Sequence, residues 1–110
     1  MNRVSFAACT FAVLASSQAF GDTRYMICFG GGRSGLYYSA VFPVPTGSKD
    51  KDMANAFRDF VKGKYAIPIF AECHTDLTQA NAESDKKIRE DADQNSKFPS
   101  KLIETGWSGK

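Results

Sequence analysis

Two cysteines, Cys28 and Cys73, constrain the fold of this chain most strongly, because they are the pair that remains once an N-terminal leader is removed. Residues 1–21 have the pattern of such a leader: Arg3 is their one charge, an apolar run too short to span a bilayer follows it, and small residues close the segment. The third cysteine, Cys9, leaves with the leader. A signal peptide of this kind predicts a secreted protein, either periplasmic or extracellular.

The mature chain, 22–110, is expected to form a single small domain. A chain of this length buries only about two-thirds of the surface that it exposes when unfolded, so a covalent crosslink adds needed stability. Cysteines pair in an oxidising compartment, and we therefore predict a Cys28–Cys73 disulfide, whose loop closure stabilises the fold by about 4 kcal/mol at most. Two free thiols or a metal site are the alternatives. With His74 as the one histidine, a four-ligand Cys/His zinc site is not expected, and neither is a cofactor.

The charge of the chain excludes some functions. The formal net charge of the full sequence is +2, and removal of Arg3 lowers it by one. So small a charge gives no electrostatic case for nucleic acid, which calls for a strongly basic face. The leader is followed by no other apolar run of membrane length, so we expect no transmembrane segment in the mature chain.

The hydrophobic pattern predicts an α+β fold. Two β-rich runs flank a glycine-rich connection at 30–35, and we expect this hairpin tip to be flexible because it is longer than a tight turn. Further along, apolar residues recur at a helical period, a short strand follows, and then a more polar helix and a closing strand. Gly63 offers the first helix a left-handed stop. The predicted elements are strands at 24–29, 36–44, 66–73 and 100–107, and helices at 50–62 and 76–93.

This order, ββαβαβ, suits a small, mainly antiparallel sheet with two helices packed on one face. The opposite face of the sheet is then uncovered. Because neighbouring strand residues point to opposite faces, either Tyr37 or Tyr38 is expected on that uncovered face, beside the tip that carries Arg33. We interpret Arg33, Tyr37 and Tyr38 as candidate binding residues for a protein or a cell-envelope glycan.

One cluster of polar residues, His74 and Asp76 after Cys73, has the composition of a catalytic set. Adjacent strand residues point to opposite faces, however, and a disulfide consumes the thiol that a cysteine nucleophile needs. We therefore predict that the protein is not an enzyme. The alternative hypothesis is a small secreted enzyme or ligand-binding protein in which His74, Asp76 and Arg33 converge across the fold.

The layout of the chain is similar to that of small secreted bacterial proteins, with Lys64-Tyr65 at the end of a helix and Glu104-Thr105-Gly106-Trp107 near the C-terminus. From these observations we predict a non-catalytic binding protein, such as an inhibitor, an immunity-type protein or an envelope-associated factor. A further hypothesis is a subunit of an envelope assembly, which predicts an unpaired edge strand.

Overall fold

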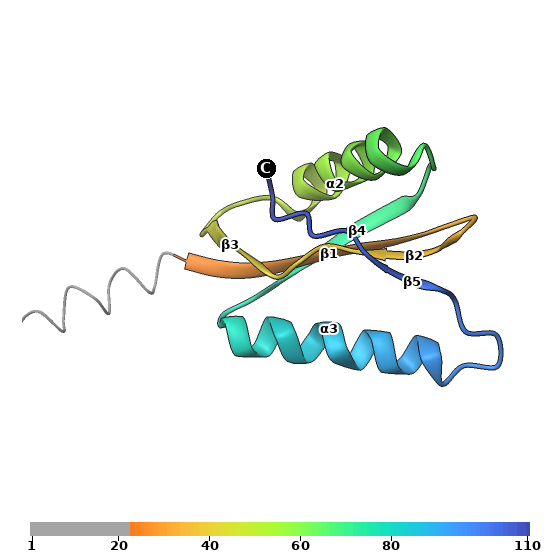
Figure 1. The fold of residues 1–110 in the computed structure, drawn as a ribbon. Helices are drawn as coiled ribbons and strands as arrows, with labels where there is room; N and C mark the ends of the chain where they lie inside the picture. The colour runs from red at the N-terminus through yellow and green to blue at the C-terminus, as the bar shows by residue number, and fades with distance from the viewer. Residues whose placement is uncertain (1–22) are drawn as a thin grey trace, which may run out of the picture.

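The computed structural model describes residues 23–110 and shows one five-stranded sheet with two helices (Figure 1). The predicted signal peptide, 1–21, lies outside the described residues, so secretion stays a prediction. The elements in chain order are β1 (Thr23–Gly32), β2 (Gly35–Tyr38), β3 (Phe42–Pro45), α2 (Asp50–Tyr65), β4 (Phe70–Asp76), α3 (Gln79–Gln94) and β5 (Leu102–Glu104).

The long strand β1 organises the sheet. Along one side it pairs antiparallel with β4. Along the other side it pairs antiparallel with β3 near its start and with β2 near its end, and β5 then joins β2 in parallel. The predicted α+β class and the mainly antiparallel sheet are confirmed. The predicted strand 36–44 is divided, because Ser39 leaves the ladder and its hydroxyl accepts a hydrogen bond from the Cys28 N–H at 2.8 Å.

Helix α2 follows the predicted amphipathic pattern. Its buried residues, Ala54, Phe57 and Val61, recur every three or four positions and face the sheet. The helix continues through Gly63, so the predicted stop at that glycine is wrong. It ends instead at Tyr65 and is capped by Ala66, which adopts a left-handed conformation with φ 56°. Pro68 follows two positions later and disfavours helical geometry at Ile67, so the helix could not continue far beyond this cap.

The two helices lie on opposite faces of the sheet (Figure 1), which corrects the expectation that both pack on one face. Met26 and Cys28 of β1 belong to the core cluster under α2, whereas the ring of Phe29 lies 4.6 Å from the Arg89 guanidinium of α3. The physical reason is the consecutive burial of Met26, Ile27 and Cys28, all 0% exposed. A strand with a continuous apolar run needs cover on both faces.

The C-terminal segment completes the core on the α2 face. The predicted closing strand is shorter than expected, and beyond β5 the chain returns to the sheet through Thr105, whose hydroxyl donates to the Tyr38 carbonyl at 2.9 Å. The indole of Trp107 then packs against Phe42 and Phe57, with ring centroids 5.3 and 5.4 Å away. Trp107 is 5% exposed, so this residue joins β3, α2 and the chain end into one cluster.

The glycine-rich connection is a shorter turn than the sequence predicted. Strand β1 runs to Gly32, and Arg33 and Ser34 alone form the turn. A Cβ atom at Gly30 would collide with the Phe70 carbonyl oxygen, and one at Gly32 would lie 2.9 Å from a methyl carbon of Ile69. The glycines therefore allow the chain before β4 to approach β1 closely.

The predicted disulfide is confirmed. Cys28 and Cys73 face each other on β1 and β4, with Cα atoms 4.0 Å apart, and the bond joins positions separated by 45 residues. Both cysteines are buried beneath α2. The crosslink therefore fixes the register of the longest strand pair in the sheet.

Replacing both cysteines, Cys28→Ser with Cys73→Ser, is expected to lower the free energy of unfolding by about 2–4 kcal/mol, because the unfolded chain regains the entropy of a long open loop. Thermal unfolding monitored by circular dichroism measures the change, and we expect Tm to fall by about 10 °C or more. Reduction of the wild-type protein is the matched comparison. A loss below about 1 kcal/mol contradicts a stabilising role for the crosslink.

Candidate functional site

The structure separates the predicted binding residues. Arg33 is exposed in the β1–β2 turn. Tyr37 and Tyr38 are 2% and 1% exposed, and their rings contact Tyr65 of α2 and Phe29 of β1, with ring centroids 5.2 and 5.8 Å apart, respectively. The sheet face that was expected to be open is covered by α3. Neither tyrosine ring is therefore open to a partner in this structure.

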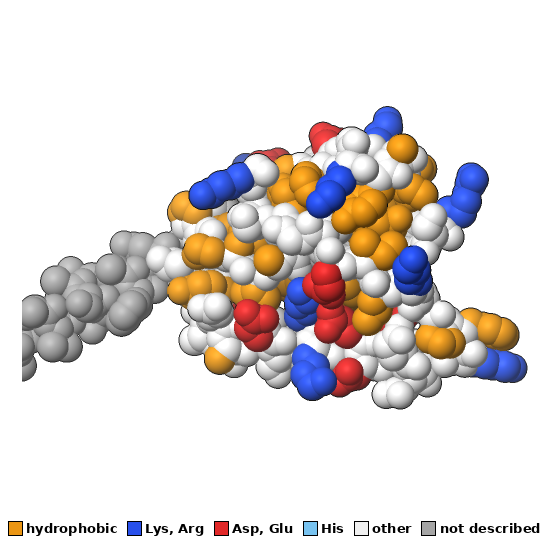
Figure 2. All heavy atoms as spheres, viewed as in Figure 1, with side chains coloured by type: hydrophobic (Ala, Val, Ile, Leu, Met, Phe, Trp, Pro, Cys, Tyr) orange, Lys and Arg blue, Asp and Glu red, His pale blue; other side chains and the backbone are white. Residues whose placement is uncertain are grey.

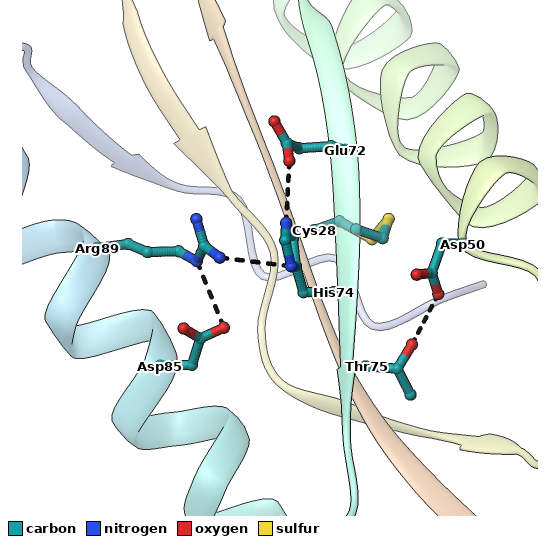
Figure 3. A network of polar contacts seen from close by, with 8 residues as sticks. Cys28, Asp50, Glu72, His74, Thr75, Asp85 and Arg89 are labelled. Carbon is teal, nitrogen blue, oxygen red and sulfur yellow. Dashed lines mark hydrogen bonds and ion pairs between the residues drawn. A yellow bond between two sulfur atoms is a disulfide. The ribbon is translucent and has the colours of Figure 1, made fainter.

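The side chain of His74 belongs to the interface between β4 and α3 (Figure 3). Its Nδ1 lies 3.4 Å from a guanidinium nitrogen of Arg89, and its Nε2 lies 2.9 Å from a carboxylate oxygen of Glu72. Because a guanidinium can only donate, Nδ1 accepts and Nε2 carries the proton toward Glu72. The imidazole also stacks on Phe29 with ring centroids 5.5 Å apart. These contacts hold His74 as a link between strand and helix.

The polar residues of the alternative hypothesis do not converge. His74 pairs with Ile27, six positions before Arg33 along β1, which corresponds to a distance of about 20 Å along a strand. Asp76 lies at the opposite end of β4 from the turn, and its Oδ2 is buried without a hydrogen-bond partner among the described residues. The Cys73 sulfur is in the disulfide on the α2 face. The geometry therefore assembles no nucleophile, base and orienting group from this set.

A second polar cluster joins α3 to β5. Lys86 donates to a Glu104 carboxylate oxygen at 2.6 Å and to the Ser39 carbonyl oxygen at 3.0 Å. Glu90 also hydrogen-bonds to Glu104, and together with Glu83 these side chains line an open cleft of about 450 Å³. Figure 2 shows acidic and basic side chains gathered where α3 meets the sheet. These polar contacts compensate for the thin apolar face of α3, which buries only Ala82.

The environment of Glu90 shifts its titration. Burial raises its pKa most, followed by the hydrogen bond to Glu104 and the charge of Glu104, to about 7 from an ordinary value of 4.5. Lys86 opposes this shift. Burial, and next the charge of Glu90, raises the pKa of the Tyr38 phenol to about 12. Glu90 therefore keeps its proton in mildly acidic solution.

One free edge of the sheet lies along β4. In the described part of the chain, β4 pairs with β1 alone. The N–H and carbonyl of Cys28 bond to Ser39, on the side of β1 away from β4. Cys28 and Cys73 are thus a non-hydrogen-bonded antiparallel pair, in agreement with their short Cα separation of 4.0 Å. The N–H and carbonyl groups of Cys73 therefore point outward from the sheet. Because the direction of these groups repeats at every second residue of a strand, those of Ala71 and Thr75 point outward as well.

A groove runs between this free edge and α2. Two adjoining hollows, each of about 240 Å³, share Ala54 and Asn55 of α2 and Ala71 of β4 in their linings. The shared lining thus consists of small side chains, of which the two alanines are apolar. Phe70, which is 94% exposed, lies at one end of the groove with Arg58, and Asp50 and Lys51 lie at the other end.

Sequence reasoning missed these edge residues. The alternation of apolar and polar residues in strand 66–73 was enough to place Phe70 on the face opposite the buried one. It does not show which strand lies at the edge of the sheet, because that depends on pairing between strands far apart in the sequence. Glu90 and Glu104 were missed for a related reason. They are 14 positions apart in the sequence, and only the parallel pairing of β5 with β2 brings them together.

Comparisons with known proteins give this chain no relative: no family model matches it, and searches of curated proteins and of solved structures gave no match. Within residues 23–110, neither helix is long and apolar enough to cross a membrane. In the same part of the chain, no three His, Cys, Asp or Glu side chains are grouped as metal ligands would be.

The raised pKa of Glu90 predicts a pH-dependent stability. Because the folded protein binds this proton more tightly than the unfolded chain does, stability falls as pH rises from about 4.5 to about 7. Glu90→Gln removes this dependence, so we expect the variant to have a higher Tm than wild type at pH 8 and a smaller difference at pH 5. Thermal unfolding at the two pH values tests this, with Glu83→Gln, an exposed carboxylate of the same helix, as the matched control. Equal pH profiles for wild type and Glu90→Gln contradict the account.

Proposed function

We propose that this protein is a secreted, non-catalytic binding protein that captures an extended segment of a partner protein on the free edge of β4. The observation that carries the proposal is that the backbone groups of Ala71, Cys73 and Thr75 point outward from the sheet, beside the groove that Ala71 and Cys73 line with α2. A strand edge with free N–H and carbonyl groups is a template for one more strand. This mode needs no catalytic residues, in keeping with the separation of His74 from Arg33.

The spacing of the free groups favours a polypeptide over a glycan. Donors and acceptors that recur at every second residue match the backbone of an antiparallel or parallel strand, which offers its own groups at the same interval. A glycan has no such repeat. The groove is also bordered by a helix, so one extended segment fits between β4 and α2 as an additional strand.

The lining of the groove indicates which side chains the segment carries. Side chains of an added strand point alternately to the two faces. Those on the α2 face meet Ala54 and Ala71, and the small volume there favours Ala, Ser, Val or Thr. Those on the other face meet Glu72 and the half-exposed ring of His74. The preferred partner is therefore a segment with small residues at alternate positions.

Ala71→Pro is the sharpest test of strand capture. The substitution removes an N–H group that points away from β1, so all hydrogen bonds between β4 and β1 remain. Edge strands tolerate proline for this reason. We expect a peptide selected from a displayed random library against the wild-type protein to lose at least about tenfold in affinity, which a lost backbone hydrogen bond and the added ring account for. Titration calorimetry measures the affinity.

Ala71→Ser is the matched control, because it changes the side chain and keeps the donor, and it should bind as wild type does. An unchanged Tm shows that Ala71→Pro still folds. Failure to select any peptide, or equal affinity for Ala71→Pro and Ala71→Ser, contradicts the proposal. Size-exclusion chromatography gives a further contradicting result: a dimer that Ala71→Pro dissociates means that the edge pairs with a second copy and not with a partner protein.

A further inference from the structure

We propose that one end of the molecule, which adjoins the groove at Phe70, docks on an anionic lipid membrane surface. This basic end consists of the β1–β2 tip (31–36), the end of α2 with its connection to β4 (62–70), and the connection from α3 to β5 (95–101). The three segments are far apart in the sequence. Figure 1 shows them together at the end of the molecule opposite the start of β1.

Direct contacts join the three segments. Gly32 lies close to the side chains of Ile67 and Ile69, and a hollow of about 430 Å³ is lined both by the tip and by the chain before β4. On the other side, the Leu36 N–H donates to the Lys101 carbonyl oxygen at 2.8 Å. Gly35 adopts φ +154°, and a Cβ there would collide with that same carbonyl. The β1–β2 tip thus holds the other two segments beside it.

The three segments of the basic end carry charges of one sign, and Asp93 of α3 borders them, with its carboxylate accepting the Ser100 N–H at 3.0 Å. The three segments contain no aspartate or glutamate, and their basic residues are Arg33, Lys62, Lys64, Lys97 and Lys101. All of these side chains belong to exposed residues. Figure 2 shows basic and no acidic side chains along the corresponding end of the visible face. The fold therefore concentrates positive charge that the small net charge of the whole chain conceals.

Two exposed aromatic side chains accompany these charges. Phe70 is 94% exposed and Phe98 is 81% exposed. They are the most exposed large hydrophobic residues of the described chain. The ammonium of Lys97 lies 5.6 Å from the centroid of the Phe98 ring, so charge and ring are presented together. Pro68, two residues before Phe70, and Pro99, directly after Phe98, are exposed as well.

Lipid headgroups fit this combination better than other polyanions do. Basic side chains are attracted to an anionic membrane surface, and aromatic rings enter the boundary between headgroups and acyl chains. Either signal alone binds weakly, whereas the two together hold a protein at the surface. A nucleic acid would use the charges, but the two rings sit on separate segments and form no continuous groove for stacked bases.

Vesicle co-sedimentation tests the proposal with two compositions, phosphatidylglycerol mixed with phosphatidylcholine, and phosphatidylcholine alone. We expect wild-type protein to bind only the mixed vesicles, with affinity that falls as salt is raised. The double variant Lys97→Gln with Lys101→Gln should bind about tenfold more weakly. Phe98→Ser should retain the salt dependence and weaken binding at every salt concentration. The matched control, Lys49→Gln with Lys87→Gln, removes two exposed lysines outside the basic end and should bind nearly as wild type does.

Several results overturn the proposal: absence of binding to the mixed vesicles, equal binding to neutral vesicles, or an equal loss in the control pair. Tighter binding to a single-stranded oligonucleotide than to the mixed vesicles also overturns it, because the basic end then serves a different polyanion. The groove variant Ala71→Pro should bind vesicles as wild type does. Failure of strand capture and failure of membrane docking are therefore separate outcomes.

Discussion

The crosslink between Cys28 and Cys73 is the constraint on which the rest of the structure depends. It joins facing residues of the two longest paired strands, and it does so at a pair whose backbone groups point away from each other. On the β1 side these groups bond to Ser39 and start the turn out of β2. On the β4 side they point toward the groove. One covalent bond thus fixes the register of the sheet and the phase of its free edge.

The two faces of the sheet are stabilised by different means. On the α2 face, aromatic rings close around Trp107 in an apolar core. On the α3 face, a polar helix covers Ile27 and Tyr38 mainly through Lys86, Arg89 and the carboxylates near Glu104. Packing of the first kind changes little with pH, whereas the second depends on which carboxylates are charged. We therefore expect the packing of α3 on the sheet to change with pH more than the packing of α2 does.

The sequence was sufficient for much of the fold. Alternation in β1 and helical spacing from Met53 to Val61 report local structure, and the cysteine count left one pairing, so class, order and disulfide could be predicted. The position of α3 could not be predicted, because a polar helix gives no sign of which face of a sheet it covers. The surfaces that we propose for binding were missed for a related reason. An edge strand and a charge-segregated end exist only after distant segments such as 31–36 and 95–101 have been brought together.

Strand capture requires β4 to be an edge strand whose outward backbone groups are available to a partner. Hydrogen exchange of individual amides, followed by NMR on the oxidised protein alone, measures whether these groups are protected. We expect an alternating pattern in β4: slow exchange at Glu72 and His74, which bond to β1, and fast exchange at Ala71 and Thr75, which face outward. Uniformly slow exchange through all four residues would contradict it, because another part of the chain or a second copy would then already occupy the edge.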